Sequence, residues 1–170
     1  MVIMEPDTKP ARRPHRLPDA DYVGRKLVSF TVCERRRSRG LATPAVTGAI
    51  RAALESSVAK HHCVVPLYVV MPDHVHLAIL GETETSNARK AMDAFKLRTG
   101  RWFRDHRPNL GWQRSYWDHI VRSHESANAH LRYLAANPCR AGLAEDIYSW
   151  PFTGCIGYDL CDVLHDAFWD

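Results

Sequence analysis

The stretch Val69–Leu80, "VVMPDHVHLAIL", sets two apolar runs on either side of a Pro-Asp turn. Two such runs joined by a proline-containing turn predict a β-hairpin. The second run carries His74 and His76 with one residue between them. Since successive side chains of a strand point to opposite faces, we expect both imidazoles on one face and the alternating apolar residues on the other, against the core.

Apolar periodicity on both sides of this hairpin predicts the remaining elements. We expect strands over 26–33, 63–71, 74–80 and 116–122, and helices from Thr43 to about 62, from Ser86 to about 103, and from Ser123 to Pro138. The order β-α-β-β-α-β followed by a helix is that of a split βαβ unit. We therefore predict an α+β fold, a ferredoxin-like antiparallel sheet with two helices on one face and the other face free for a site.

The charge of the chain is unevenly distributed. Residues 1–130 hold 21 Lys+Arg and 13 Asp+Glu, whereas residues 131–170 hold 2 and 6. A basic body of this kind is typical of a protein that binds a polyanion, although a solvated basic surface explains the charge equally well. The densest basic run is Glu34–Gly40, "ERRRSRG", here termed the arginine loop, which follows the first predicted strand.

The 170 residues are enough for one domain with a substantial core. We expect a flexible, proline-rich basic arm over 1–20, a folded domain over 21–154 and an acidic tail over 155–170. No run of about 18 apolar residues is present, so no membrane span is expected. The five cysteines form no Cys-x-x-Cys pair. Their number and spacing argue against a disulfide scaffold or a zinc ribbon and favour a reducing cytoplasm.

Two histidines on one strand face, about 7 Å apart along the strand, can converge on one metal ion. Two histidines near a turn are more often ordinary polar residues, so the pair needs independent support. The segment "HLRYLAANPCRAGL" supplies it, because Tyr133 and Asn137 lie four residues apart on one helix face. Tyr133 could act as a nucleophile. Asn137 could be a third metal ligand, whereas a packing tyrosine and a helix cap are the plainer interpretations.

With these motifs in view, the chain resembles the single-tyrosine HUH transposases, and among them the REP-associated tyrosine transposases. The resemblance covers about residues 22–154 and is carried by "MPDHVH" (71–76), "WQRSYWDHIVR" (112–122), "YLAANPCRAGL" (133–143) and "YSWPFTG" (148–154). It implies a divalent cation, Mg²⁺ or Mn²⁺, bound by His74, His76 and Asn137. It further implies that Tyr133, on a C-terminal catalytic helix, nicks and joins single-stranded hairpin DNA, and that the protein is a monomer or a homodimer.

Nine residues are predicted to contact the DNA: Arg35, Arg36, Arg37, Arg39, Arg89, Lys90, Arg101, Gln113 and Arg114. Trp112, Tyr116 and Trp117 could stack on bases, but we expect at least one of them in the core. Two other functions remain open from the sequence. A catalytically silent nucleic-acid-binding module would need neither the strand histidines nor the tyrosine. A metal-dependent phosphodiester hydrolase would use the histidines with water in place of Tyr133.

Overall fold

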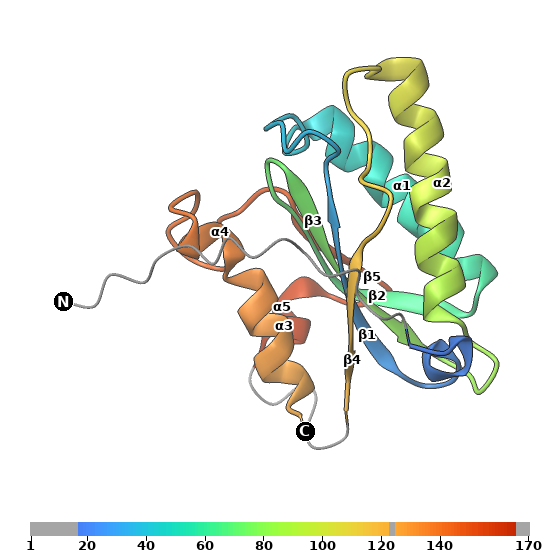
Figure 1. Ribbon diagram of the computed structural model, residues 1–170. Coiled ribbons are helices and arrows are strands. Elements are labelled where there is room, and N and C mark those ends of the chain that lie inside the picture. The colour runs from blue at the N-terminus through green and yellow to red at the C-terminus, as the bar shows by residue number, and fades with distance from the viewer. Residues whose placement is uncertain (1–16, 123–124, 166–170) are drawn as a thin grey trace.

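One five-stranded sheet forms the centre of the molecule (Figure 1). The computed structural model describes residues 17–122 and 125–165. The strands are β1 (Leu27–Cys33), β2 (Cys63–Val70), β3 (His74–Gly81), β4 (Trp117–Val121) and β5 (Thr153–Ile156). They lie in the order β4-β1-β3-β2-β5, and all neighbours are antiparallel. The first four strands confirm the predicted ferredoxin-like order, with the hairpin of β2 and β3 at its middle.

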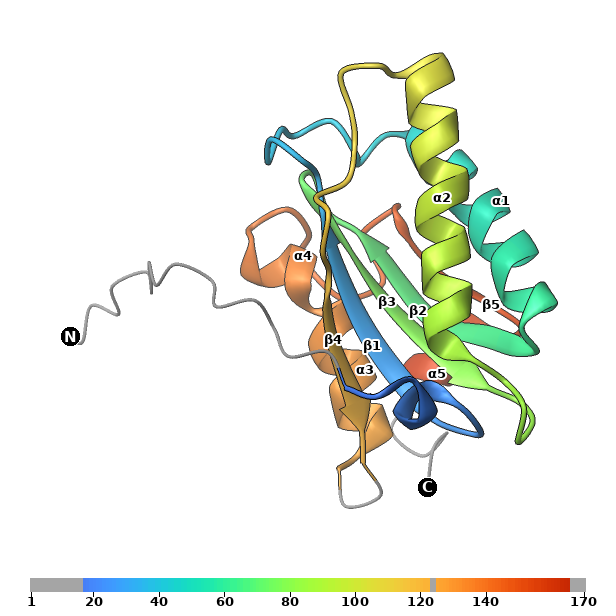
Figure 2. The ribbon, with the colours of Figure 1, turned by 45° about the vertical axis from the view of Figure 1, so that its right-hand side comes forward.

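Helices cover both faces of this sheet (Figure 2). The helices are α1 (Pro44–Lys60), α2 (Ala88–His106), α3 (Ala127–Ala135), α4 (Asn137–Arg140) and α5 (Leu160–Leu164). The predicted pair, α1 and α2, lies together on one face. The opposite face was expected to be free, and this is wrong, because Leu131 of α3 and Val163 of α5 are buried in one cluster with Val69 and Ala78 of the sheet. None of the helices in the described ranges is long and apolar enough to cross a membrane.

The alternation along β3 decides which residues face which helix layer. Val75 and Leu77 are fully buried in the core beneath α1 and α2. Ala78 packs in the other cluster, with α3 and α5. His74 and His76 precede Ala78 by four and two residues, so they share its face of the strand. The predicted assignment of the two faces is confirmed.

The first two helices begin where short polar side chains can cap them. Thr43, where the first helix was predicted to begin, caps α1, and its side chain accepts a hydrogen bond from the helix. The cap of α2 is Asn87, one residue after the predicted start at Ser86. The Ser86 hydroxyl is engaged outside the helix, since its oxygen accepts from the main-chain amide of Thr83 at 2.9 Å and its proton is donated to the carbonyl of His62.

The third predicted helix is divided in two. Ser126 caps α3, and the predicted start at Ser123 lies outside the described residues. The helix ends at Ala135, and Pro138 stands in the first turn of the next helix, α4. Proline is well tolerated there because the first N–H groups of a helix have no partner within it.

No helix or strand was predicted beyond Pro138, and an acidic tail was expected from residue 155. The structure instead shows β5 crossing that boundary and α5 packed against the sheet, so this segment belongs to the fold through residue 165. Gly154 permits the pairing, because a Cβ there would lie 2.4 Å from the hydroxyl oxygen of Tyr68 on β2. A strand of four residues shows too little alternation to be predicted. Residues 1–16 of the predicted N-terminal arm lie outside the described residues. The end of that arm overlaps a short 3-10 helix, η1, formed by Asp19–Tyr22.

Candidate active site

His74 and His76 turn their Nε2 atoms toward one another at the start of β3. The two nitrogens are 3.1 Å apart, and the rings are nearly perpendicular, at 89°. Two nitrogens that bind one metal ion at about 2.1 Å and at a right angle lie about 3 Å apart. The separation therefore fits a single ion shared by both imidazoles.

The outer nitrogens of both rings have polar partners. Nδ1 of His74 lies 2.7 Å from Oδ1 of Asp73, and Nδ1 of His76 lies 2.9 Å from the hydroxyl of Thr31. Burial, and after it the charges of His74 and Arg140, lower the pKa of His76 to about 3, so this ring stays neutral. Such partners fix the ring orientation of metal-binding histidines and leave the inner nitrogen as the ligand.

Arg37 of the arginine loop lies next to this pair. Its Nε is 3.1 Å from Oδ2 of Asp73, and its guanidinium also donates to the sulfur of Cys33, at 2.8 Å. The φ of Arg37 is +57°, a left-handed backbone that ordinary side chains seldom adopt. Arg37 was predicted to contact DNA, but its charged group is engaged by the carboxylate that holds His74.

A buried glutamate shapes the arginine loop. Oε2 of Glu34 accepts hydrogen bonds from the main-chain amides of Arg36, at 2.7 Å, and Ser38, at 2.8 Å. Burial opposes the charge of Glu34, but the hydrogen bonds outweigh it and lower the pKa of this carboxyl. With the main chain held from inside, the side chains of Arg35, Arg36 and Arg39 are exposed on the surface.

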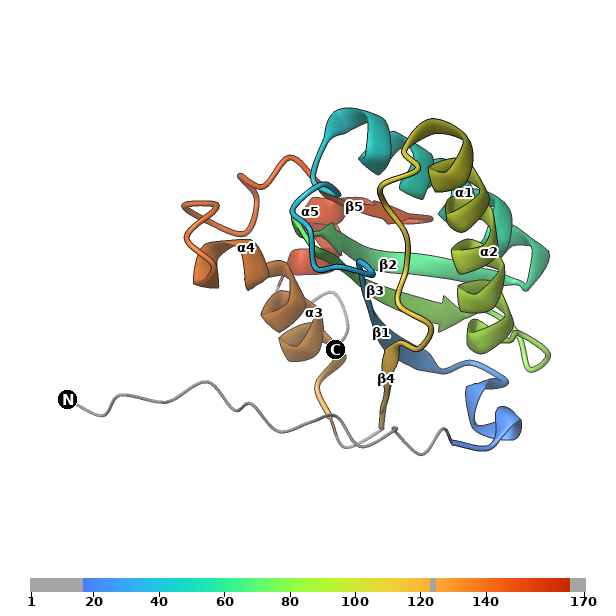
Figure 3. The same ribbon diagram turned by 45° about the horizontal axis from the view of Figure 1, so that its top comes forward.

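Tyr133 and Asn137 are brought together by Arg140. The guanidinium of Arg140 lies 4.0 Å from the ring centroid of Tyr133 and donates to Oδ1 of Asn137 at 2.8 Å. Nδ2 of Asn137 donates to the carbonyl of Leu134, which fixes the orientation of the amide. Helix α3 covers the sheet face that carries the histidines (Figure 3). The Tyr133 side chain is 62% exposed, and no hydrogen bond among the described residues joins it or Asn137 to the histidines.

The two Nε2 atoms of His74 and His76 form a donor set that fits a divalent cation. Within residues 17–122 and 125–165, no three His, Cys, Asp or Glu side chains form a group that could hold a metal ion. Imidazole suits Mn²⁺ at least as well as Mg²⁺, which prefers oxygen. His74 and His76 would hold the ion, and oxygen atoms of Asn137, of water or of the substrate would fill the other positions.

The predicted basic contacts on α2 lie at its two ends. Arg89, at the first turn, forms an ion pair with Asp19 of η1 and is not a free cation. Lys90 beside it is exposed. Arg101 is exposed in the second half of the helix, which runs toward the arginine loop. Of the predicted contacts on this helix, Lys90 and Arg101 are therefore available to phosphates.

The segment after α2 carries two of the predicted DNA contacts, Gln113 and Arg114. The main-chain amide of Gln113 donates to the carbonyl of Cys33 at 2.9 Å, which fixes this segment to the end of β1. The side chain of Gln113 donates to the carbonyl of Glu34 at 3.4 Å, and Arg114 is exposed. Lys96 of α2 donates to the carbonyls of both residues and holds them in place.

The three candidate stacking residues have different environments. Tyr116 is 3% exposed, packs edge-on against Phe30, and donates to Asp93, so it belongs to the core as expected for at least one of the three. Trp112 is half-buried, and its indole N–H donates to the hydroxyl of Thr99. Trp117 is 54% exposed and is the one whose ring is largely accessible to a base.

Sequence reasoning missed a further histidine on α3. His130 is half-buried, its Nε2 is buried with no hydrogen-bond partner among the described residues, and its ring centroid lies 5.5 Å from that of His119 on β4. Burial, and after it the charge of His119, lower the pKa of His130. His119 is bonded to Glu125 at 2.7 Å. No periodic pattern in the sequence indicates that His119 on β4 and His130 on α3 lie close together, because their proximity depends on the tertiary structure.

Comparison with known proteins places the chain in a family. The model of a family described as "Transposase IS200 like" matches residues 26–137, which is more than half of the chain. The chain belongs to the IS200-like transposase family. This finding confirms the predicted resemblance, and the matched range contains both histidines, Tyr133 and Asn137.

Individual members of the family agree with this assignment. A putative REP-associated tyrosine transposase of Haemophilus influenzae is 22% identical over 144 residues, 78% of this chain and 81% of that protein. The REP-associated tyrosine transposase of Escherichia coli is 28% identical over 90 residues, about half of each chain. A solved structure of a REP-associated tyrosine transposase bound to a REP hairpin is 23% identical, with a TM-score of 0.65, over 86% of this chain and 82% of that one. The structural match confirms the fold of this IS200-like chain.

Proposed function

We propose that this chain is a metal-dependent tyrosine transposase that nicks and rejoins single-stranded DNA beside REP-like hairpins through a 5′-phosphotyrosine intermediate. The observation that carries the proposal is the 3.1 Å separation of the His74 and His76 Nε2 atoms on the sheet face that α3 covers. The solved relative bound to a REP hairpin supports a hairpin as the ligand.

The reaction is a transesterification. The Tyr133 hydroxyl oxygen attacks the phosphorus, the bond from phosphorus to the 3′ oxygen breaks, the tyrosine loses its proton and the leaving 3′ oxygen gains one. One phosphoester bond replaces another, so the strand can be rejoined by the reverse reaction. The exposure of Tyr133 leaves its hydroxyl accessible to a DNA strand. A divalent cation held by His74 and His76 would stabilise negative charge on the phosphate and on the leaving oxygen.

The surface around the site supplies cations for the DNA backbone. Arg35, Arg36 and Arg39 are exposed at the end of β1, whose last residue, Cys33, pairs with His74 in the sheet. Phosphate contacts of this kind release counterions, so affinity for single-stranded DNA should fall steeply with salt.

The test of the proposal is a covalent adduct. Wild-type protein, Mn²⁺ and a hairpin oligonucleotide labelled at its 3′ end should give a labelled band of protein size on a denaturing gel. Tyr133→Phe keeps the ring but has no oxygen to attack with, so it should bind DNA normally and give neither cleavage nor adduct. Tyr148→Phe is the matched control, because Tyr148 is similarly exposed, at 54%, and should leave the adduct unchanged.

The same experiment separates the two other functions. Cleavage by Tyr133→Phe at a near-normal rate, without an adduct in the wild type, would identify a hydrolase that uses water. DNA binding without any cleavage by the wild type, over a range of Mn²⁺ and Mg²⁺ concentrations, would identify a binding module.

A further inference from the structure

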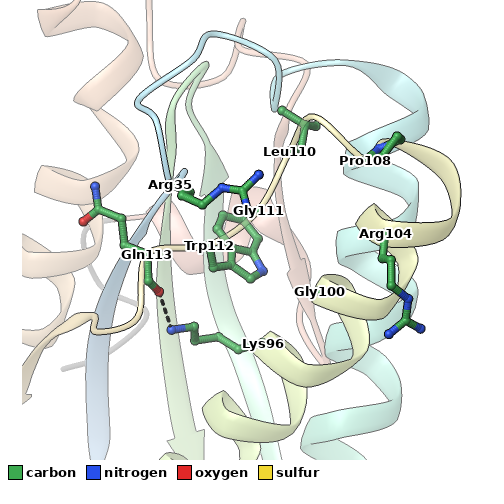
Figure 4. Close-up of a pocket in the computed structure, with 9 residues that line it drawn as sticks. All are labelled: Arg35, Lys96, Gly100, Arg104, Pro108, Leu110, Gly111, Trp112 and Gln113. Carbon is green, nitrogen blue, oxygen red and sulfur yellow. Dashed lines mark hydrogen bonds between the residues drawn. The ribbon is translucent and has the colours of Figure 1, made fainter.

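A pocket of about 450 Å³ opens between the arginine loop, the second half of α2 and the segment that follows α2 (Figure 4). The amide of Arg35 donates to the carbonyl of Gly111 at 2.6 Å, which joins the loop to this segment. Gln113 is bonded in turn to Cys33, the sheet partner of His74. The pocket therefore lies at the same end of the sheet as the histidine pair, but it contains neither histidine.

The pocket has a positive charge. Arg35, Lys96 and Arg104 line it, and no lining residue is acidic. Arg35 takes part in none of the ion pairs of the described residues, and the pair of Arg104 with Asp105 is largely exposed, so it neutralises little. Lys96 reaches across to the carbonyl of Gln113 and holds one wall in place (Figure 4). An anionic ligand is favoured in such a pocket.

The pocket also has flat and apolar surfaces. The Arg35 guanidinium lies against the main chain at Gly111, where an added Cβ would be in ordinary contact with its central carbon, at 3.4 Å. Trp112 lies beside Arg35, and its ring packs on Phe103 at 5.0 Å between centroids. A bare anion needs no such surface, whereas a nucleic-acid base stacks on guanidinium and indole planes.

Gly100 keeps one side of the pocket open. It lies in the interior of α2, where glycine is less favourable than any residue except proline. A Cβ at Gly100 would meet no atom within 4 Å, so packing does not require glycine here. Gly48, in the interior of α1, has the same free space but does not line the pocket. The two glycines therefore form a matched pair for experiment.

We propose that this pocket binds one unpaired nucleotide of the DNA substrate, with the base against Arg35 and Trp112 and its phosphate near the lining cations. The inference rests on the proposed function and adds a specificity site separate from the histidines and Tyr133. One nucleotide identity should then be preferred at a fixed distance from the hairpin.

The first experiment uses the full chain and small probes. Titration with dAMP, dCMP, dGMP, TMP and inorganic phosphate is followed by the amide signals of Gly100 and Gly111 and the indole signal of Trp112 in NMR spectra. One nucleotide should shift all three signals at a lower concentration than the others. Equal responses to inorganic phosphate and to every nucleotide would overturn the proposal of a base pocket.

The second experiment fills the pocket without removing a charge. Gly100→Leu should be at least as stable as wild type, yet bind hairpin DNA with a single-stranded extension about tenfold more weakly, with an unchanged salt slope. Gly48→Leu should bind within about twofold of wild type. Unchanged binding by Gly100→Leu would overturn the inference alone, because the adduct formed by Tyr133 would still test the proposed function. Failure of the wild type to bind this DNA at all would overturn both.

Discussion

Asp73 accepts from His74 with one carboxylate oxygen, at 2.7 Å, and pairs with Arg37 through the other, at 3.1 Å. The contact with His74 fixes which imidazole nitrogen faces His76, because the proton sits on the side of the carboxylate. Arg37 in turn holds the carboxylate from the arginine loop. A loop that would otherwise be assigned to DNA binding therefore also helps to orient the two histidines that we propose hold the cation.

Removal of the carboxylate should weaken cation binding. Asp73→Ala leaves the His74 ring without its outer partner, so the affinity for Mn²⁺ should fall by about 10- to 100-fold. Titration followed by the EPR signal of free Mn²⁺ measures it without any DNA. Glu55→Ala is the control, since Glu55 forms an exposed ion pair with Arg51 on α1, across the sheet from the site. Equal Mn²⁺ affinity in Asp73→Ala and wild type would contradict an orienting role.

Arg36 and Arg37 should differ although they are adjacent. Arg36→Gln removes an exposed cation, so the slope of log affinity for single-stranded DNA against log salt should become shallower by about 0.7. Arg37→Gln should keep the wild-type slope and lose Mn²⁺ affinity, because its guanidinium is engaged by Asp73. Both slopes come from fluorescence anisotropy at several salt concentrations. The opposite pattern would make Arg37 the phosphate contact.

The strength of the sequence prediction lay in the period-2 pattern of β3. Alternation alone places His74 and His76 on one face of the strand, where the structure pairs them with Cys33 and Thr31 of β1. Tyr133 could likewise be placed on a helix by its spacing. These features depend on local geometry, which short-range patterns record well.

The partners of the site residues could not be predicted in the same way. Arg37 reaches Asp73 only because its backbone is left-handed and because buried Glu34 holds the loop from inside. Arg140 reaches Asn137 because the chain is helical through Pro138 as α4, whereas the predicted helix ended at that proline. Both contacts depend on a local backbone conformation that no hydrophobic periodicity reports.

His130 should make the protein less stable in acid. Burial holds the pKa of His130 below the ordinary value of 6.5. As the pH falls, His130 is therefore protonated at a higher pH in the unfolded chain than in the folded one. Its contribution to the free energy of unfolding is complete above pH 6.5 and is lost as the pH falls through the folded pKa. His130→Gln should therefore lose less stability than wild type between about pH 7.5 and about pH 5 in urea unfolding. The control is His106→Gln, an exposed change on α2, which should lose as much stability over this pH range as the wild type. An equal loss in His130→Gln would refute the prediction.

Arg140 should oppose cation binding in the free protein. It donates to Oδ1 of Asn137, and its charge is among those that lower the pKa of His76, so it lies near the position of the expected ion. Arg140→Gln removes this repulsion and the competing charge-assisted hydrogen bond. A gain of about 1 kcal/mol, about fivefold in Mn²⁺ affinity, is expected for one unit charge at this range in a wet site.

The same EPR titration measures this gain, with Arg98→Gln as the control, because Arg98 is an exposed cation on α2, on the other face of the sheet. Tyr133 should also become more mobile in Arg140→Gln, since the guanidinium 4.0 Å from its ring is gone. Adduct formation should then fall while Mn²⁺ affinity rises. The adduct reports the position of the nucleophile, whereas the EPR titration reports binding of the ion. A lower Mn²⁺ affinity in Arg140→Gln would show instead that Arg140 supports the metal site by holding Asn137 in place.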